Sequence, residues 1–491
     1  MAYATTESRH RFLRYFQDLL QGMEECDDLE LADALRLSDK KVRVPLPVLP
    51  LQLLLGRGDG YQLRLEPEWV VRADGSFARS GNFLLFDPST FFDGISGFLR
   101  LTPNGSLTLG RDDPLQRRLL DYPKLVANSH LRLKLSAKGL ALKNKAPKRG
   151  ICIAPLPAPA EAEHMRRWRQ AKIERLAKVI GAPIDTLPRG EALALLEQVN
   201  AVMEHEPYRL QTDDGRPGGL LRLPGRPVPV FVGDLHACID NLLVILTQNG
   251  FLEGLLAGSV MLIIVGDAVH PDTPGHEEEM DRSMLLMDLI FRLKLRFPER
   301  VFYLRGNHDD FAEDINKGGV PQGLLWERAL CDERGVRYRD AMQRLYDLLP
   351  YVAVSNRYIA CHAGAPTMKA SRKDLIHVRD KPKLEHQLTH LRLRKPNSPI
   401  GYGLADVRRL RRRLGVQPNT PFVVGHTPLS VDDTLWLNAG GIENHHVLFG
   451  ANPDCVGVIT RPRNKLVPIT YPTEPLLPVF NRLLRTGRMA A

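Results

Sequence analysis

The sequence has no long apolar run and few cysteines. Nowhere in its 491 residues do apolar residues approach the roughly 20 in a row that a membrane-spanning helix needs. Its first residues, MAYATTESRHRFLRYF, lack the basic-then-apolar order of a secretory signal. The six cysteines, at positions 26, 152, 238, 331, 361 and 455, form no CxxC pair, which argues against a disulfide framework or a structural zinc. These absences predict a cytoplasmic protein without a membrane segment.

The composition is that of a globular protein, with 43% hydrophobic and 25% charged residues. Its length suggests about two to four domains. The net charge of +10 and the pI of 9.3 raise nucleic acid as a partner. However, the basic residues cluster in short stretches, at 392–395 and 408–413, with little aromatic interleaving for base stacking. A solvated helix face, or attraction of acidic phosphorylated substrates, explains them as well, so we do not expect nucleic-acid binding.

Five short polar motifs recur in order in the second half of the chain, each directly after an apolar run. The runs predict short buried strands, and residues 241–248 and 283–296 between them are candidate crossover helices. Because ligands gather at the carboxyl ends of strands in such sheets, all five motifs fall where a site is expected. The motifs are GDLH (233–236), GDAVHP (266–271), RGNHDD (305–310), CHAG (361–364) and GHTP (425–428), after the expected strands 228–232, 261–265, 301–304, 357–360 and 422–424.

The residue types in these motifs are those that a two-metal site needs. Carboxylate oxygens and imidazole nitrogens, with one Asn carbonyl, suit Mn, Fe or Zn better than an all-oxygen Mg or Ca cage. Two ions roughly 3.5–4 Å apart can hold the attacking and leaving oxygens of a displacement at phosphorus. One carboxylate must then bridge both ions.

At these motifs the chain resembles the calcineurin-like metallophosphoesterases, and among them the phosphoprotein phosphatase branch in its bacterial form. GDLHACIDNLL, LRGNHD and CHAG resemble that branch's motifs, over roughly residues 226–470. Nuclease-type relatives carry a second His in the last motif, where this chain has Pro428. The resemblance therefore implies a phosphatase or a dinucleoside polyphosphate hydrolase.

The resemblance also implies residue roles. Two divalent metals are expected, with Mn first and Fe or Zn as alternatives, and a metal-bridging hydroxide would attack phosphorus. His308 would protonate the departing alkoxide. Arg305 would lie near the substrate phosphate, or would be a structural ion-pair partner. The implied metal ligands are Asp234, His236 and Asp267 for the first ion, and Asp267, Asn307, His362 and His426 for the second.

The second motif departs from the family pattern GDxVDRG. His270 and Pro271 replace the Asp that orients the general-acid His and the Arg that grips the phosphate. His308 then lacks its carboxylate partner, for which Asp309, Asp310 and Asp272 are candidate substitutes. Losing a general acid typically costs about 10²–10⁴-fold in rate. The alternatives are therefore a metal-dependent phosphatase acting on a phosphorylated protein or a small phosphate ester, and an impaired pseudophosphatase that serves as a phosphopeptide-binding scaffold; the retained ligand set favours an enzyme.

Residues 97–155 predict a small all-β module, with hairpins at Asn104-Gly105 and Lys138-Gly139. Gly110-Arg111 and Ser129-His130 resemble a forkhead-associated domain, whose members bind phosphothreonine peptides. The family's phosphate-contacting Ser falls on Ala127, while Arg111 remains a possible phosphate contact. A structural β-sandwich is the alternative.

The expected fold class is α/β, a metallophosphoesterase β-sandwich flanked by helices, with the small all-β module upstream. Residues 1–95 have no assigned role; they include a packing helix at 9–23 and an extended connection at 45–55. A Pro/Ala linker at 154–160 precedes two amphipathic helices, 161–179 and 189–204, which should pack on the phosphatase domain. The expected segments are 1–95, 97–155, 156–222 (linker and helices), 226–470 (phosphoesterase) and 471–491 (C-terminal tail).

Overall fold

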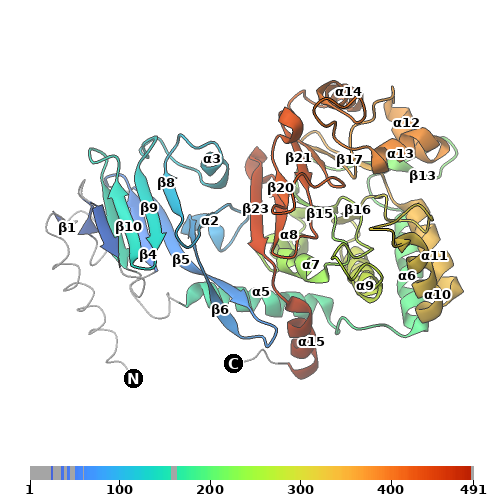
Figure 1. The fold of residues 1–491 in the computed structure, drawn as a ribbon, viewed down its shortest axis with the longest axis horizontal. Coiled ribbons are helices and arrows are strands. Elements are labelled where there is room, and N and C mark those ends of the chain that lie inside the picture. The colour runs from blue at the N-terminus through green and yellow to red at the C-terminus, as the bar shows by residue number, and fades with distance from the viewer. Residues whose placement is uncertain are drawn as a thin grey trace. The chain divides into compact units, whose positions relative to one another are not determined.

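The computed structural model of the protein describes residues 24–25, 35–37, 41–44, 50–58, 60–155 and 163–487. The chain divides into two compact units, Met1–Glu174 and Arg175–Ala491, whose elements are labelled in Figure 1. The helix expected at 9–23 and the Pro/Ala residues 156–160 lie outside the described residues. Within the described part, no helix is long and apolar enough to cross a membrane.

The first unit is a β-sandwich. Its seven-stranded sheet has the order β1-β2-β11-β4-β5-β6-β7 and its four-stranded sheet the order β3-β10-β9-β8. Short helices α2 (Pro88–Phe91) and α3 (Gln116–Leu119) lie between strands, and α5 (His164–Ile180) follows the sandwich. The strands are β1 (Glu24–Glu25), β2 (Leu35–Arg36), β3 (Lys41–Val44), β4 (Leu51–Leu55), β5 (Tyr61–Val71), β6 (Phe77–Phe86), β7 (Leu99–Leu101), β8 (Ser106–Leu109), β9 (Leu131–Ser136), β10 (Gly139–Asn144) and β11 (Ile151–Pro155).

The alternating sequence of β9 explains how the sandwich buries its core. Leu131, Leu133 and Leu135 are buried, while the basic residues between them are exposed, as period-two alternation requires. The hairpin expected at Lys138-Gly139 is confirmed, because β9 and β10 pair antiparallel across it. The hairpin expected at Asn104-Gly105 is wrong: β7 pairs with β6 and β8 with β9, so this turn carries the chain from one sheet to the other.

The sandwich begins earlier in the chain than residue 97. Strands β4, β5 and β6 belong to the same sheet as β7 and β11, and residues 37–153 contribute to one core. Residues 51–55, expected as a connection, form the fully buried strand β4. Cys152 in β11 is disulfide-bonded, unlike the four free cysteines of the described chain, so the expectation drawn from the scattered cysteines does not hold at this position.

The second unit is built on two sheets. One has seven strands in the order β12-β13-β17-β18-β19-β21-β20, and the other has five in the order β16-β15-β14-β22-β23. Both mix parallel and antiparallel pairs; β14, β15 and β16 are parallel neighbours. The strands are β12 (Arg209–Gln211), β13 (Pro217–Arg222), β14 (Val228–Val232), β15 (Val260–Ile264), β16 (Val301–Tyr303), β17 (Val352–Val354), β18 (Ile359–Cys361), β19 (Phe422–Val424), β20 (Leu435–Trp436), β21 (His445–Leu448), β22 (Cys455–Thr460) and β23 (Val467–Pro472).

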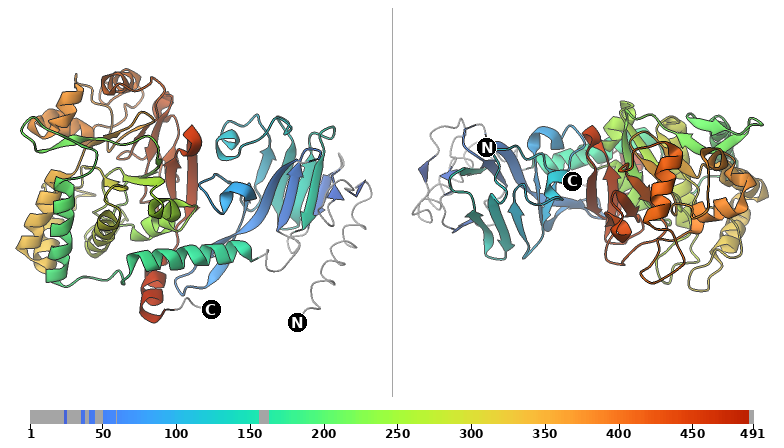
Figure 2. Two further views of the ribbon diagram at one scale, coloured as in Figure 1. Left: turned by 180° about the vertical axis from the view of Figure 1, so that it is seen from behind. Right: turned by 90° about the horizontal axis from the view of Figure 1, so that it is seen from above.

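Helices flank these sheets. In both Figure 1 and Figure 2, α12, α13 and α14 lie together beside the larger sheet, and α6, α10 and α11 lie side by side. The buried residues of α12 to α14 share one hydrophobic core with strands β17, β18, β19 and β21. The helices are α6 (Arg189–Glu204), α7 (Ile239–Leu246), α8 (Phe251–Leu256), α9 (Asp281–Arg296), α10 (Gln322–Arg334), α11 (Val336–Leu348), α12 (Arg372–Ile376), α13 (Pro382–His390), α14 (Leu404–Leu414) and α15 (Leu476–Thr486).

A second core lies between the two sheets and positions the motif strands. Phe231, Ile263 and Phe302 of the smaller sheet pack with Ala360 and Val423 of the larger one. All five expected motif strands and both crossover helices are present, with bounds that differ by at most a few residues. The continuous apolar runs therefore predicted the strands because these strands are buried on both faces.

Buried ion pairs join the helical segment 189–206 and the helices α9 and α10 to this unit. Lys294 of α9 donates to Glu206 at 2.6 Å, and Arg334 of α10 pairs with Asp288 of α9 at 2.6 Å. Burial alone would raise the pKa of Glu206, but the charges of Lys294 and Arg209 hold it below its usual value. Such pairs fix the helices in place, since removing one partner would leave a buried charge.

The unit extends beyond the expected phosphoesterase segment at both ends. Residues 217–222 form β13 of the larger sheet instead of a linker. The expected tail contains α15, whose first turn is tied to α7 by the Leu477 amide, which donates to Asp240 at 2.7 Å. Asn481 of α15 exchanges hydrogen bonds with the backbone of Ile184. Domain boundaries drawn from composition missed these long-range contacts.

Candidate active site

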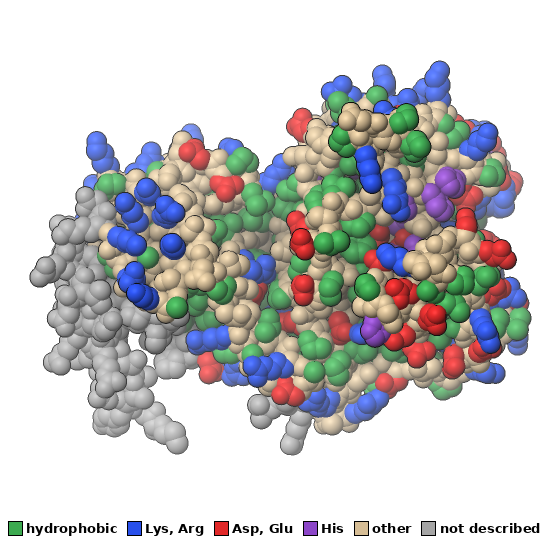
Figure 3. All heavy atoms as spheres, in the orientation of Figure 1, with side chains coloured by type: hydrophobic (Ala, Val, Ile, Leu, Met, Phe, Trp, Pro, Cys, Tyr) green, Lys and Arg blue, Asp and Glu red, His purple; other side chains and the backbone are tan. Residues whose placement is uncertain are grey.

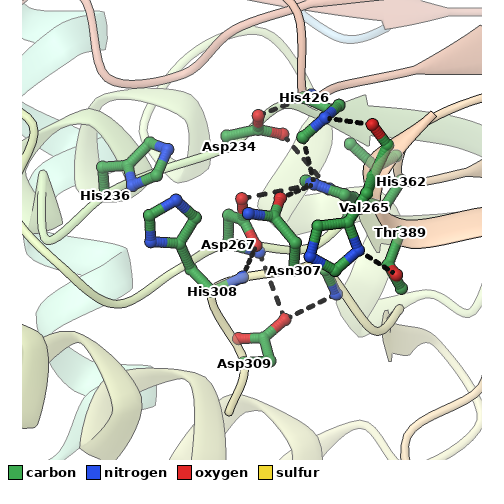
Figure 4. A network of polar contacts seen from close by, with 12 residues as sticks. Asp234, His236, Val265, Asp267, Asn307, His308, Asp309, His362, Thr389 and His426 are labelled. Atoms are coloured by element: carbon green, nitrogen blue, oxygen red, sulfur yellow. Dashed lines mark hydrogen bonds and ion pairs between the residues drawn. The ribbon is translucent and has the colours of Figure 1, made fainter. Parts of the chain in front are cut away.

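The five motifs meet at one edge of the two sheets. Asp234 follows β14, Asp267 follows β15 and Asn307 follows β16 in the smaller sheet, while His362 and His426 follow β18 and β19 in the larger one. Figure 4 shows these side chains directed toward one another from the two sides. The six residues predicted as metal ligands are thus brought into one buried or half-buried cluster.

The densest part of the cluster surrounds the His362 ring. Its Nε2 lies 2.9 Å from Oδ1 of Asn307, 3.2 Å from Oδ2 of Asp267 and 3.2 Å from Nδ1 of His426. Separations of roughly 3 Å are those between neighbouring ligand atoms around a divalent ion bound at about 2.1 Å. One group that could hold a metal ion therefore contains Asp267, His362 and His426.

A second group shares Asp267. It contains His236, Asp267 and His308, with one ligand atom of each within 4.8 Å of the others. Asp234, predicted as a ligand on this side, is in neither group, but its Oδ1 lies 3.7 Å from Nδ1 of His362. That buried oxygen accepts no hydrogen bond among the described residues. A buried carboxylate oxygen without a donor is costly, so Asp234 is free to bind a cation.

Backbone carbonyls fix the orientation of the three predicted histidine ligands. His236 donates from Nδ1 to the carbonyl of His270 at 2.9 Å, and His362 donates from Nδ1 to the carbonyl of Val265 at 3.0 Å. His426 donates from Nε2 to the carbonyl of His390 at 3.0 Å. Because a carbonyl can only accept, the other ring nitrogen of each histidine faces the cluster, which is the arrangement typical of metal-binding histidines.

The electrostatics of the cluster are those of a cation site. Burial and the neighbouring Asp267 raise the pKa of Asp234 to about 7, although nearby histidines oppose this. Burial alone would lower the pKa of His362, but the carboxylates of Asp267 and Asp234 raise it to about 9. The carboxylates thus attract positive charge to this point. The donor set, the fixed rings and this charge all fit divalent metal ions.

Two glycines make room for the carboxylates. A Cβ placed on Gly306 would lie 2.0 Å from Oδ1 of Asp267, and one on Gly425 would lie 1.9 Å from Oδ1 of Asp234. These are the glycines of the RGNHDD and GHTP motifs. They are needed here because the backbone passes against the ligand oxygens.

The motif loops hold several non-glycine residues in the left-handed region of the backbone map. Such conformations cost of order 1–3 kcal/mol each and persist only where surrounding structure imposes them. The residues and their φ values are His236 (39°), Ala237 (63°), Asp267 (52°), His270 (68°) and His426 (64°).

His308, the predicted proton donor, lies beside the second group. Its amide donates to Oδ1 of Asp267 at 2.8 Å, and its ring lies at 4.9 Å from the ring of His236. Its Nδ1 lies 2.9 Å from Nδ1 of His270, which is completely buried. Burial lowers the pKa of His308 to about 4, with Asp267 opposing this. The sequence showed that His270 stands where the family pattern has an Asp. It did not predict that the His270 ring would hydrogen-bond to His308, the residue that this Asp orients in the family.

None of the three candidate substitutes bonds to the His308 ring. Asp309 lies beneath the site and accepts a hydrogen bond from the amide of Gly306 at 2.7 Å. Burial raises the pKa of Asp309 to about 6. Asp309 accepts from the Tyr303 hydroxyl, Asp310 accepts from Arg305 at 2.5 Å, and Asp272 pairs with Lys317.

Arg305 has the contacts of the ion-pair alternative. Its side chain is 7% exposed, pairs with Asp310 and lies over the Tyr346 ring at 5.7 Å. Arg392, in a basic stretch of the sequence, is an exposed cation near the cluster. Its charge contributes to lowering the pKa of His426, after the larger effects of burial and His362. Sequence reasoning noted the stretch at 392–395 but not its place beside the site.

Residues 229–453 match the calcineurin-like phosphoesterase family. This part of the chain is a calcineurin-like phosphoesterase domain, as its motifs predicted.

Relatives of this domain include protein phosphatases. The chain is 32% identical over 139 residues to Serine/threonine-protein phosphatase PP2A-like PPG1 of Candida albicans, which covers 28% of this chain and 29% of that protein. It is 29% identical over 133 residues to Serine/threonine-protein phosphatase rdgC of Drosophila melanogaster, covering 27% and 18%. The chain thus spans less than a third of the length of these curated relatives.

Among solved structures, the chain is similar to a protein serine/threonine phosphatase from Saccharomyces cerevisiae with similarity to human phosphatase PP5. The TM-score is 0.44 at 16% identity, over 58% of this chain and 90% of that one. It is also similar to a cold-active protein-tyrosine phosphatase of a psychrophilic Shewanella species, with a TM-score of 0.33 at 13% identity, over 52% and 82%.

Proposed function

We propose that the second unit is a metal-dependent phosphoesterase of the phosphoprotein phosphatase type, which acts on a phosphorylated protein or a small phosphate ester. The observation that carries this proposal is the orientation of three histidine rings by backbone carbonyls, so that a bare ring nitrogen of each faces Asp267 and its neighbours. Metal-binding histidines are typically held in this way, with the other ring nitrogen left for the ion.

Two divalent ions would be held as the resemblance implies. Asp234, His236 and Asp267 would bind one, and Asp267 would be shared with the second. Mn is the first expectation. Fe and Zn are alternatives, because they also bind mixed oxygen and imidazole ligands. When bound, such ions polarise phosphoryl oxygens and make a nucleophilic water available near neutral pH. The second ion would be held by Asp267, Asn307, His362 and His426.

Side chains around the ligands would bind the substrate phosphate and interact with the leaving oxygen. Arg392 is the proposed phosphate contact, because its guanidinium is exposed and has no hydrogen bond or ion pair within the described residues. Figure 3 shows Lys, Arg and His side chains close together at the surface of this unit, which would attract an anionic substrate. Arg305 would support the site through Asp310, and His308 would interact with the leaving oxygen.

Hydrolysis of p-nitrophenyl phosphate tests this proposal. The protein is stripped of metal, given Mn²⁺, and assayed beside an Asp267→Asn control with metal analysis of both. We expect turnover that depends on Mn²⁺ and a large loss of both metal and turnover in Asp267→Asn, because that change weakens the ligand shared by both ions. Full activity in the control would refute the two-metal assignment.

Metal bound without turnover of this ester or of phosphopeptides would favour the pseudophosphatase alternative. In that case phosphopeptide binding would be expected at the upstream sandwich, since it carries the forkhead-associated-like motifs. There Arg111 donates to the carbonyl of Val126 at 2.7 Å, and the buried His130 accepts from the amide of Ala127 at 3.0 Å. Capture of a phosphothreonine peptide by this unit stays a prediction.

A further inference from the structure

The hydrogen bond between two histidine rings distinguishes this site from one with a carboxylate at position 270. Nδ1 of His270 and Nδ1 of His308 lie 2.9 Å apart, so one nitrogen donates and the other accepts. With Nδ1 of His308 occupied in this way, its Nε2 is the nitrogen that remains for the site. Figure 4 shows the His308 ring beside His236 and Asp267. His270 therefore holds His308 through a hydrogen bond to Nδ1, as a carboxylate could, but it brings no negative charge.

The rest of the His270 ring confirms that no charge is supplied there. Its Nε2 is buried and has no hydrogen-bond partner among the described residues. The ring packs edge-on against Trp326, with ring centres 6.3 Å apart. The three acidic residues that could have replaced the missing carboxylate are bonded elsewhere. Within the described residues, the His308 ring thus has a neutral hydrogen-bond partner at Nδ1 and no carboxylate bonded to it, while Asp267 and Asp272 act on it only through their charge.

This difference bears on the leaving group. In hydrolysis, a water oxygen bonds to phosphorus and the bond from phosphorus to the leaving oxygen breaks; that oxygen keeps the electron pair and must be stabilised. An alkyl oxygen is strongly basic and needs a proton as it departs. A carboxylate behind the imidazole stabilises the imidazolium form that can give this proton. A phenolate or a phosphate leaving group departs without one and can be protonated later by solvent.

We propose that His270 is a specificity-determining positioning residue, which holds His308 as a hydrogen-bond donor to the leaving oxygen without the charge that assists full proton transfer. This inference rests on the proposed phosphoesterase function. It assigns the substrates to phosphate esters and anhydrides with a weakly basic leaving oxygen. Tyrosine phosphate in a peptide and a dinucleoside polyphosphate share this chemistry, whereas serine and threonine phosphates do not.

The first test uses the wild-type, metal-loaded protein. Its kcat/KM is measured for p-nitrophenyl phosphate, phenyl phosphate and ethyl phosphate, and for matched peptides with tyrosine or serine phosphate, beside diadenosine tetraphosphate. We expect aryl esters to exceed alkyl esters by about 10²–10⁴-fold, the usual contribution of a general acid. Comparing the tyrosine phosphate peptide with diadenosine tetraphosphate then shows which of these two kinds of substrate the site prefers. Aryl and alkyl esters within tenfold of each other would overturn the inference without any variant.

The second test restores the charge. His270→Asp places a carboxylate oxygen at the position of Nδ1, and we expect it to raise the ratio of ethyl phosphate to p-nitrophenyl phosphate hydrolysis at least about tenfold. His270→Asn is the matched control, because its side-chain amide occupies the same position without charge; its aryl-to-alkyl ratio should equal that of the wild type. Equal ratios in the Asp and Asn variants would refute the role of charge at this position.

Other outcomes are separable. A loss of both activities in equal proportion, with metal content unchanged, would show a structural role for His270 and overturn its assignment to specificity. If His270→Asp fails to hold metal, the wild-type ratio alone decides. No metal-dependent turnover of any ester would refute the proposed function itself, whereas turnover without an aryl preference would refute only the inference about His270.

Discussion

Replacing Gly306 by Ala should disable the site without changing any ligand. The new Cβ would lie 2.0 Å from Oδ1 of Asp267 and 2.8 Å from its amide nitrogen. Gly306 is not among the glycines with positive φ, so alanine is compatible with its backbone and the conflict is one of space. To restore an ordinary contact, the carboxylate must move by at least about 1 Å, and a displacement of that size typically costs about 10²-fold in rate.

The assay is kcat/KM for p-nitrophenyl phosphate at saturating Mn²⁺, together with metal content and urea unfolding of the same preparation. We expect kcat/KM to fall by about 10²-fold or more, with metal content reduced because Asp267 is the shared ligand. The fold should persist, since the substituted position is in a loop and not in either core. A change confined to stability would indicate a folding defect instead.

Gly190→Ala is the matched control. A Cβ at Gly190, near the start of α6, meets no atom within 4 Å. This variant should keep full activity and metal content. If Gly306→Ala retained wild-type kcat/KM and two bound metals, the assignment of Asp267 as the crowded, bridging ligand would be refuted.

Three further outcomes are expected elsewhere in the unit. Because the pKa of Glu206 is lowered in the folded state, its contribution to stability is present above the unfolded value of about 4.3 and is lost as the pH falls. Urea unfolding between pH 3 and 6 should show this loss, and Glu206→Gln should flatten it while leaving Lys294 buried without its partner. Arg334→Met leaves the buried carboxylate of Asp288 without its ion-pair partner, so it should lower the free energy of unfolding by about 3–5 kcal/mol at pH 7. A much smaller decrease would mean that water reaches and solvates Asp288. Arg392→Gln should lower kcat/KM about tenfold, as loss of one charged phosphate contact implies, whereas Arg305→Gln should mainly lower stability; the reverse pattern would exchange their roles.

The motif strands and the ligand cluster could be predicted from the sequence because each depends on local information. A continuous apolar run such as 228–232 signals a strand buried on both faces, and a polar motif after it falls at the strand end. The order of five such motifs then predicted that Asp267 and His426, which are far apart in the chain, would meet.

The partners of individual side chains could not be predicted in this way. The sequence showed that His270 replaced a carboxylate, but only the packing of two loops places its ring against His308. The alternative roles of Arg305 were equally compatible with the sequence, since its contacts with Asp310 and Tyr346 depend on tertiary structure. At Asn104-Gly105 the turn signal was real, but a turn cannot tell whether its strands pair with each other or join different sheets.

The left-handed residues of the motif loops have a consequence for how metal is acquired. Five non-glycine positions around the cluster hold a conformation that an unfolded chain rarely visits. Because these loops are anchored at the ends of strands in the two sheets, we expect them to keep that conformation when no ion is bound, so that binding has little ordering left to drive. Metal loss should therefore abolish turnover while leaving most of the fold intact, and each empty domain should be able to take up ions again without refolding.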